Sequence, residues 1–346
     1  MRALLATAIA LSVFVLRAQT ETAHIRAAFL EMISRPRVPL AAETRPRIDA
    51  GSYRSEHFTF ASEAGERVPG IFLTSVRSKD RRPAVIFLHG TGSRKEEFLA
   101  IMRTFADRGF ATAAIDARHH GARIVGDSGA DNAQYYAAML DTYRTGKGRP
   151  YLYDTVWDVM RLVDYLGTRG DVDAARIGLM GISKGGTEAY LAAAVDTRIA
   201  AAVPIIGVQG FRWALDNNQW QPRVGTFAPA VESAARDAGV PVDAAFVRRF
   251  YDRVVPGVYA DYDAGSMLAL TAPRPVLVIN GDSDALTPLP GVQEAMASAR
   301  IAYTRMGAGE KIGFYLQPNA GHVVTPVAEL VMADWFVKWL APGSLQ

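Results

Sequence analysis

Residues 176–190 form one distinctive stretch of the sequence, Arg-Ile-Gly-Leu-Met-Gly-Ile-Ser-Lys-Gly-Gly-Thr-Glu-Ala-Tyr. An apolar run opens it, a turn rich in glycine follows, and an alanine-rich helical pattern continues to residue 195. The pattern predicts a strand, a tight turn and a helix, with Ser183 on the turn. Gly181 and Gly185 lie two residues before and two after the serine, where the strand and helix backbones must pass closely.

Gly-x-Ser-x-Gly between a strand and a helix is typical of a nucleophilic serine. On such a turn the hydroxyl group of Ser183 stands clear of the sheet, and the backbone N–H of Lys184 points at the oxygen of a bound carbonyl. The helix N-terminus behind the turn favours negative charge. The alternative is a glycine turn that only joins a buried strand to a helix. The rest of the chain decides between them, because a serine enzyme also needs a base, an acid and a second oxyanion donor.

The composition of the 346 residues is that of an ordinary globular protein, with 49% hydrophobic and 21% charged residues. A chain of this length can bury a large core. The net charge is +3 and no long basic run occurs, so the sequence gives no support for nucleic-acid binding. The chain contains no cysteine, which excludes a thiol nucleophile and a cysteine-ligated metal.

The first 20 residues differ from the rest of the chain. Met1-Arg2 precedes an uncharged apolar run over residues 3–16, and Arg17 and Ala18 follow it. A positive start, a short apolar run and a small residue near its end predict a secretory signal peptide, hence a secreted or periplasmic protein. The run is short for a membrane span, so no stable membrane insertion is expected once it is removed. An uncleaved membrane anchor and a buried helix remain as alternatives.

The remaining chain alternates between strand and helix patterns. Residues 21–54 form a lead-in segment with helical spacing over residues 21–33, and residues 56–62 and 67–75 predict an antiparallel hairpin. Continuous apolar runs predict buried strands at residues 83–88, 110–115, 199–206, 275–280 and 312–317. Helical spacing occurs over residues 98–108, 154–167 and 328–340. This alternation predicts an α/β fold with a mostly parallel sheet, helices on both faces and an active site at the C-terminal ends of the strands.

Residues 207–268 follow no such pattern and are rich in aromatic side chains. A long irregular stretch between two core strands predicts a cap-like insertion over the site. Trp213 and Trp220 within it have two interpretations: they form an apolar pocket for an acyl group, or they pack the insertion onto the core.

Polar residues follow the predicted strands in a definite order: Ser183, then Asp284, then His322. In this order and setting, residues 55–341 resemble the α/β-hydrolase superfamily. Residues 116–121, Asp-Ala-Arg-His-His-Gly, are similar to the Asp-x-Arg-Gly-His-Gly segment of its dienelactone-hydrolase and prolyl-oligopeptidase-like branch, with His119 in place of the first glycine.

The resemblance implies a role for each residue. Ser183 attacks an acyl carbonyl, His322 takes its proton, and Asp284 orients the imidazole. Asp282 is the other carboxylate at this strand end, and we expect it to be a turn residue that accepts hydrogen bonds from its own backbone. His89-Gly90-Thr91-Gly92 resembles the oxyanion loop of the superfamily, which assigns the donors to the N–H groups of Thr91 and Lys184.

Gly92 is the alternative to Thr91 as a donor, and His89 is expected to brace the loop. Other residues near the strand ends are expected to be structural. We expect this of Asp116 and Arg118, and we expect His120 at the rim of the site. Adjacent His119 and His120 point apart on an extended chain, so a metal site is not expected. The Lys184 side chain is expected at the edge of the cleft, either solvated or recognising an acidic group of the substrate.

These residues predict a serine hydrolase that cleaves a small carboxylic ester through an acyl-enzyme, without a cofactor. An acyl-thioesterase and a peptidase are alternatives within the superfamily, and Gly-Ile-Ser-Lys-Gly-Gly also resembles the turn of acyl-CoA thioesterases. The alternative to an enzyme is a non-catalytic binding protein with the same fold.

Overall fold

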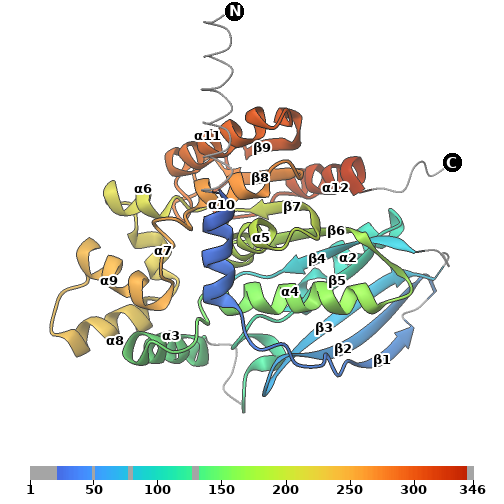
Figure 1. The fold of residues 1–346 in the computed structure, drawn as a ribbon, viewed down its shortest axis with the longest axis horizontal. Helices are drawn as coiled ribbons and strands as arrows, with labels where there is room; N and C mark the ends of the chain where they lie inside the picture. Colours follow the sequence, from blue (N-terminus) through green and yellow to red (C-terminus); the bar gives the residue numbers. More distant parts are fainter. Residues whose placement is uncertain (1–21, 49–50, 77–80, 127–131, 341–346) are drawn as a thin grey trace, which may run out of the picture.

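The computed structural model describes residues 22–48, 51–76, 81–126 and 132–340 (Figure 1). The predicted signal peptide, residues 1–20, lies outside the described residues, so it stays a prediction. In the described part of the chain, no helix combines the length and the apolar character needed to cross a membrane.

The described residues form a nine-stranded sheet in the order β1-β2-β3-β5-β4-β6-β7-β8-β9. The first three strands pair antiparallel, β3 pairs antiparallel with β5, and all pairs from β5 to β9 are parallel. The strands are β1 (Glu43–Ile48), β2 (Tyr53–Glu63), β3 (Glu66–Ser75), β4 (Arg82–Leu88), β5 (Ala111–Ile115), β6 (Val172–Ile182), β7 (Ile199–Ile205), β8 (Val276–Gly281) and β9 (Ile312–Gln317). The predicted hairpin and mostly parallel sheet are therefore confirmed.

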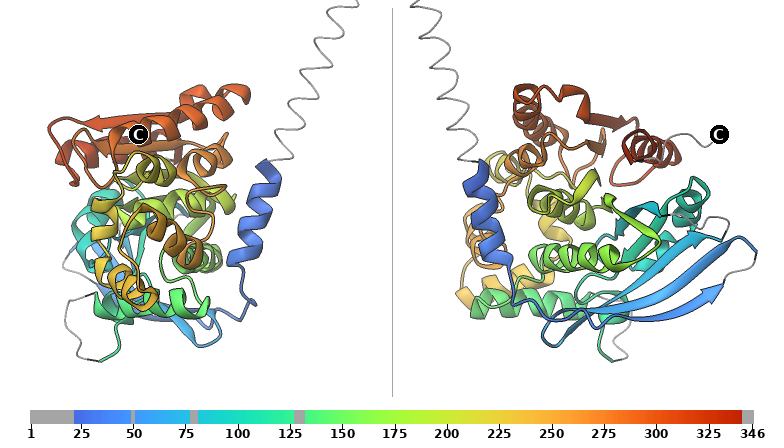
Figure 2. Two further views of the ribbon diagram at one scale, coloured as in Figure 1. Left: turned by 90° about the vertical axis from the view of Figure 1, so that its left-hand side faces the viewer. Right: turned by 45° about the vertical axis from the view of Figure 1, so that its right-hand side comes forward.

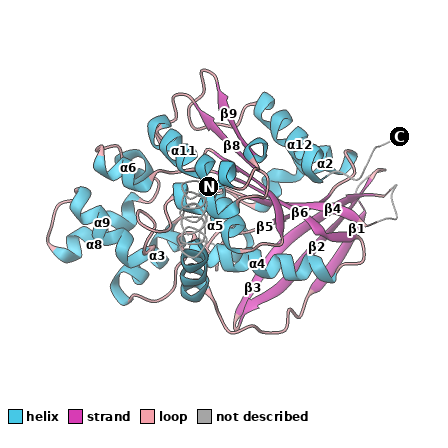
Figure 3. Cartoon of the chain, turned by 45° about the horizontal axis from the view of Figure 1, so that its top comes forward, coloured by secondary structure: helices cyan, strands magenta, loops and turns pink. Residues whose placement is uncertain are grey.

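Strand β4 shows why the sheet needs cover on both faces. Its side chains alternate between two hydrophobic clusters, with Ile86 and Leu88 in one and Val85 and Phe87 in the other. Helices α4 (Tyr153–Thr168), α5 (Lys184–Val195) and α10 (Ala264–Thr271) belong to the first cluster, and α2 (Leu99–Asp107) and α12 (Pro326–Leu340) belong to the second. Figure 3 shows the strands running through the molecule between these helices. A strand that is buried on both faces reads as the continuous apolar run seen in the sequence.

Outside the insertion, one strand and two α-helices escaped the sequence analysis. Strand β1 extends the sheet into the predicted lead-in segment, so the sheet begins before residue 55. Residues 43–45 are exposed at this edge and carry no apolar alternation. Helix α3 (Ala133–Thr145) lies in a polar, tyrosine-rich stretch, and α11 (Leu289–Arg305) links β8 to β9. The predicted helix near the start is present over residues 22–33 and lies beside α5 and α10, with Arg26 donating to the carbonyl groups of Ala194 and Leu270 (Figures 1 and 2).

Between β7 and β8 the chain forms a set of short helices: α6 (Phe211–Asp216), α7 (Gln221–Gly225), α8 (Ala228–Ala238) and α9 (Ala244–Val254). They gather with α3 on the side of the molecule opposite to β1 (Figure 1). Helix α10 completes this segment and packs on α5 as part of the core. The irregular stretch at residues 207–268 therefore ends inside a core helix, because a short apolar helix has no periodicity that separates it from the insertion.

Candidate active site

Ser183 lies on the turn between β6 and α5, as its flanks predict. Its backbone has φ 57° and ψ −116°, a region that a residue with a Cβ adopts only when its surroundings hold it there. The Ser183 N–H donates to the Ile205 carbonyl group of β7 at 2.9 Å, and the Ser183 carbonyl group accepts from Thr187 N at 3.0 Å. These bonds fix the turn to the neighbouring strand and to the helix.

The two glycines of the motif are required by close approach. A methyl group on Gly181 would overlap the carbonyl group of Gly185, and a methyl group on Gly185 would overlap the Leu88 carbonyl group at the end of β4. The strand, the helix and β4 therefore meet through their backbones. Any larger side chain at these positions would move Ser183 relative to the strand ends.

His322 joins Ser183 to Asp284. Its Nε2 lies 2.7 Å from Ser183 Oγ, and its Nδ1 lies 2.7 Å from Asp284 Oδ2. The structure thus brings together three residues that are up to 139 positions apart in the chain. Such a row can move a proton from the hydroxyl group to the imidazole while the carboxylate stabilises the charged ring.

Asp284 is held by the loop that follows β8. Its carboxylate accepts from Leu286 N at 2.8 Å, Thr287 N at 3.2 Å and the Thr287 hydroxyl group at 2.7 Å. Burial alone would raise the pKa of Asp284, but the hydrogen bonds from His322 and Thr287 outweigh it and the pKa is lowered. The residue is therefore a carboxylate at neutral pH. Thr287 was not singled out in the sequence, since a threonine in a loop carries no distinguishing signal.

Asp282 lies on the turn after β8, as expected, and it also bonds to a second loop. Its carboxylate accepts from the N–H groups of Asn319 at 2.7 Å and Ala320 at 3.1 Å, which belong to the loop that carries His322. These backbone hydrogen bonds lower the pKa of Asp282. The Asp282 backbone N–H and the Ser283 side chain contribute to the same shift, which agrees with the expected turn role. Asp282 in addition joins two loops, which was not predicted because the sequence does not show which loop lies opposite.

The loop after β4 directly contacts the turn that carries Ser183. A Cβ on Gly90 would lie 3.4 Å from Ser183 Cβ, and Thr91 lines a cavity together with Ser183 and His322. His89 braces this loop: its Nε2 accepts from Ala117 N at 3.0 Å, and its Nδ1 lies 2.8 Å from the Gly90 carbonyl oxygen.

The Lys184 side chain does not lie at the edge of the cleft. It is 1% exposed, and its Nζ lies 2.6 Å from Oε1 of Glu188, which is itself fully buried. The expectation of a solvated or substrate-binding lysine was wrong, because the side chain points from the Ser183 turn into the core. Only the backbone N–H of Lys184, at the start of α5, remains beside Ser183.

His120 is another correction. It was expected at the rim but is buried, with its Nδ1 2.8 Å from the Arg118 carbonyl oxygen and its ring against Tyr135 at 4.7 Å between centroids.

Asp116 is fully buried and accepts from the N–H groups of Lys95 and Ala122. Arg118 pairs with Glu63 and, at 3.3 Å, with Asp158. Within the described residues, no three His, Asp or Glu side chains are grouped to hold a metal ion.

A cavity of about 370 Å³ opens over Ser183 and His322. Five aliphatic side chains line it, together with Thr91, Asn132 and Thr226: Ile182, Ile206, Leu286, Val323 and Val324. Past Asn132 lies a second hollow of about 630 Å³ with a polar wall that includes Arg94, Glu96, Glu97 and His119. The site therefore offers a small apolar space next to Ser183 and a larger polar space beyond the loop of residues 89–92.

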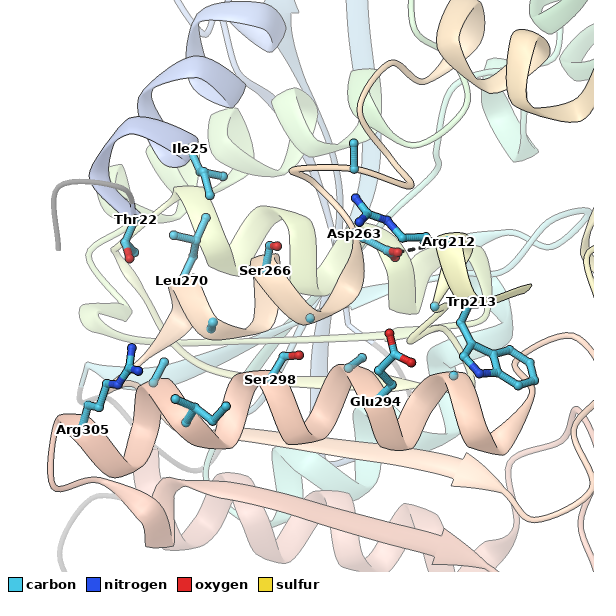
Figure 4. Close-up of a pocket in the computed structure, with 18 residues that line it drawn as sticks. Thr22, Ile25, Arg212, Trp213, Asp263, Ser266, Leu270, Glu294, Ser298 and Arg305 are labelled. Carbon is cyan, nitrogen blue, oxygen red and sulfur yellow. Dashed lines mark hydrogen bonds between the residues drawn. The ribbon is translucent and has the colours of Figure 1, made fainter. Parts of the chain in front are cut away.

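A separate hollow of about 500 Å³ lies between the helix over residues 22–33, α6, α10 and α11 (Figure 4). Its wall includes Trp213 and Asp263 and none of Ser183, Asp284 and His322. Trp213 packs over Gly291, and Trp220 is buried in the first cluster. Neither tryptophan lines the cavity at Ser183, so their packing role is the one observed.

The chain is similar to known esterases. The model of the acetyl xylan esterase family AXE1 matches residues 45–212, which include Ser183. The Bacillus subtilis (strain 168) protein YtaP, named as a hydrolase, is 27% identical over 288 residues, covering 80% of this chain and 84% of that protein. The 4-O-methyl-glucuronoyl methylesterase of Neurospora crassa is 24% identical over 233 residues, covering 64% of this chain and 56% of that enzyme.

The solved structures that resemble this chain also include an acetyl xylan esterase. Acetyl xylan esterase 1 from Thermoanaerobacterium sp. JW/SL YS485 superposes with a TM-score of 0.68 and 17% sequence identity, covering 93% of this chain and 94% of that chain. At this identity the likeness establishes the fold, and the chemistry rests on the residues described above.

Proposed function

We propose that the chain is a serine hydrolase of the carboxylesterase type, in the esterase-like branch of the α/β-hydrolase superfamily, and that it forms an acyl-enzyme on Ser183. The observation that carries this proposal is the row Ser183–His322–Asp284, with two hydrogen bonds of 2.7 Å. His322 removes the Ser183 proton as the hydroxyl group attacks the carbonyl carbon, and then gives it to the leaving alcohol. Water repeats the sequence on the acyl-enzyme and releases the acid.

The backbone N–H groups of Thr91 and Lys184 stabilise the oxyanion in this proposal. Both belong to segments in contact with Ser183, and neither depends on its side chain. Removal of one such donor in other serine enzymes costs about 10²–10³ in rate.

The substrate we infer is an ester of a sugar. Relatives named acetyl xylan esterase and glucuronoyl methylesterase act on esters of carbohydrates. The apolar cavity at Ser183 suits a small acyl group, and the polar hollow beyond Asn132 suits an alcohol with many hydroxyl groups. The buried Lys184 side chain removes the feature that favoured an acidic group on the substrate. The apolar start of the chain supports action outside the cytoplasm.

Covalent labelling tests the proposal. A fluorophosphonate should label the protein at Ser183, and Ser183→Ala should lose both the label and the hydrolysis of p-nitrophenyl acetate by at least about 10³-fold, because the nucleophile is gone. Acetylated xylo-oligosaccharides should be cleaved with a higher kcat/KM than p-nitrophenyl esters of long acids. Folded Ser183→Ala protein that keeps wild-type activity would overturn the assignment of the nucleophile, whereas a preference for long acyl chains would overturn only the substrate class.

A further inference from the structure

Asn132 lies where the two hollows of the site meet. It lines the cavity over Ser183 and His322, and it also lines the polar hollow beyond that cavity. Of the described residues that line either space, Asn132 is the one that lines both. A substrate whose acyl group reaches Ser183 while its alcohol part extends into the polar hollow must therefore pass this side chain.

The Asn132 side chain is not used to cap its own helix. Asn132 directly precedes α3, at the position where an asparagine side chain normally accepts a hydrogen bond from the first turn. Here the side chain makes no such bond. The backbone carbonyl group of Asn132 accepts from Tyr136 N at 2.9 Å and so begins the helix. The amide group of the side chain is held by other contacts.

Tyr136 fixes which way this amide group faces. The Tyr136 hydroxyl group donates to the Thr226 carbonyl oxygen at 3.2 Å, and a carbonyl oxygen can only accept. The tyrosine oxygen is then left to accept a hydrogen bond. The amide atom 3.3 Å from it is therefore Nδ2 of Asn132 and not Oδ1. The two bonds assign the ends of the amide group and tie it to the insertion through Thr226.

The amide group lies against Gly92, in the loop that also carries Thr91. A Cβ on Gly92 would lie 3.1 Å from Nδ2 of Asn132 and 3.5 Å from Oδ1. Gly92 also has a φ of 78°, which a residue with a Cβ rarely adopts. Glycine at this position therefore leaves room for both polar atoms of Asn132 beside the loop, at the boundary between the two hollows.

Asn132 keeps one acceptor and one donor for a ligand. A primary amide has an oxygen and two N–H bonds, and Tyr136 takes one N–H. Within the described residues, no group donates to Oδ1 and none accepts from the second N–H. The side chain is partly exposed, so a molecule in the hollows can reach these atoms. A neutral acceptor beside a donor matches a hydroxyl group, which can itself both donate and accept.

We propose that Asn132 determines specificity by hydrogen bonding to a hydroxyl group of the sugar ring that carries the ester. Tyr136 and the Thr226 carbonyl group hold its amide in the orientation that this contact needs. The proposal rests on the proposed function, because it takes the alcohol part of the substrate to lie in the polar hollow. Asn132 binds the alcohol part and makes no contact with the oxyanion.

The experiment compares two acetate esters of six-membered rings: methyl β-D-xylopyranoside with one acetyl group, which keeps its other hydroxyl groups, and cyclohexyl acetate, which has none. Asn132→Leu has a similar size but no polar atom. It should lower the kcat/KM ratio of the sugar ester to cyclohexyl acetate by about tenfold, mainly by raising KM for the sugar ester. Tyr136→Phe should lower the ratio by about threefold, because the amide remains but loses its anchor.

Leu286→Ala is the matched control. Leu286 lines the same cavity with an apolar side chain, so its truncation should affect both acetates alike and keep the ratio. Circular dichroism checks the folding of each variant. An unchanged ratio in folded Asn132→Leu overturns the proposal. A fall in kcat by the same factor for both esters also overturns it, because Asn132 would then contact the oxyanion.

A binding measurement separates this proposal from the proposed function, because it needs no hydrolysis. Ser183→Ala protein labelled in its asparagine side chains is titrated with methyl β-D-xylopyranoside, and Asn132→Asp identifies the amide signal of Asn132 by its loss. We expect that signal to shift as the sugar binds. A signal that stays in place up to saturating sugar overturns the proposal, whether or not the wild type cleaves the esters. Failure of the wild type to cleave either acetate counts against the proposed function alone.

Discussion

The strand-end loops and the helical insertion both border the cleft, but different forces hold them. At the strand ends, backbones touch without room for a Cβ, and the side chains of Asp282, Asp284 and His322 each make two or more hydrogen bonds. The insertion is held mainly by ring packing, such as Phe227 against Phe250 and Phe211 against Tyr251. Where backbones touch, the polar groups of the site can adopt only one arrangement. Where aromatic rings pack, one apolar side chain can replace another, and such changes can alter the space for the substrate.

Two carboxylates on the loop after β8 test this comparison with the largest expected effect. Asp284→Asn should lower kcat by on the order of 10⁴, because an amide facing Nδ1 of His322 favours the tautomer that cannot accept the Ser183 proton. Asp282→Asn should lower it by about tenfold or less, since asparagine keeps one acceptor oxygen for the His322 loop. Steady-state kinetics with p-nitrophenyl acetate measures both, and circular dichroism checks their folding. Equal losses in the two variants would mean that loop anchoring, and not imidazole orientation, limits the rate.

The same contrast explains what the sequence could predict. Ser183, Asp284 and His322 follow apolar runs in a fixed order, and Gly181 and Gly185 lie where backbones approach closely. Local patterns were therefore sufficient to predict that these residues meet at the strand ends. Partnerships across loops were not predictable, because nothing in a linear pattern shows that Asp282 faces Asn319.

The direction of the Lys184 side chain also escaped prediction. A lysine beside a nucleophile is expected in water, and its burial depends on Glu188, one helical turn away, whose own burial depends on the core around it. Strand β1 and the insertion helices were missed for a related reason, since an exposed edge strand and short helices packed by rings carry weak periodicity.

A smaller effect is expected in the insertion. Asp263 accepts from Arg212 N at the start of α6, and Figure 4 shows these two residues close together. It also accepts from Phe211 N, and from Ala264 N at the start of α10. Asp263→Ala should destabilise the protein by about 1–2 kcal/mol through the loss of these caps. Activity toward p-nitrophenyl acetate should stay within about threefold, because Asp263 lines the separate hollow, whose wall includes none of Ser183, Asp284 and His322. Urea unfolding at pH 7 and steady-state kinetics make the two measurements.

Asp243 provides the matched control, since it caps α9 in the same insertion through one hydrogen bond, from Phe246 N at 2.7 Å. Asp243→Ala should cost less stability than Asp263→Ala. If Asp263→Ala instead reduced the hydrolysis of this small ester a hundredfold, the insertion would set the geometry of the strand ends, and the distinction between the two regions would fail.

The smallest expected effect lies at the strand ends themselves. Thr91 lines the cavity at Ser183, yet its proposed contribution is a backbone N–H that every residue except proline retains. Thr91→Ala should therefore change kcat/KM for p-nitrophenyl acetate by no more than about threefold. A hundredfold loss would mean that the hydroxyl group of Thr91, and not its peptide N–H, contacts the reacting oxygen. Retained activity would agree with the proposal that backbone contacts fix the positions of the catalytic groups.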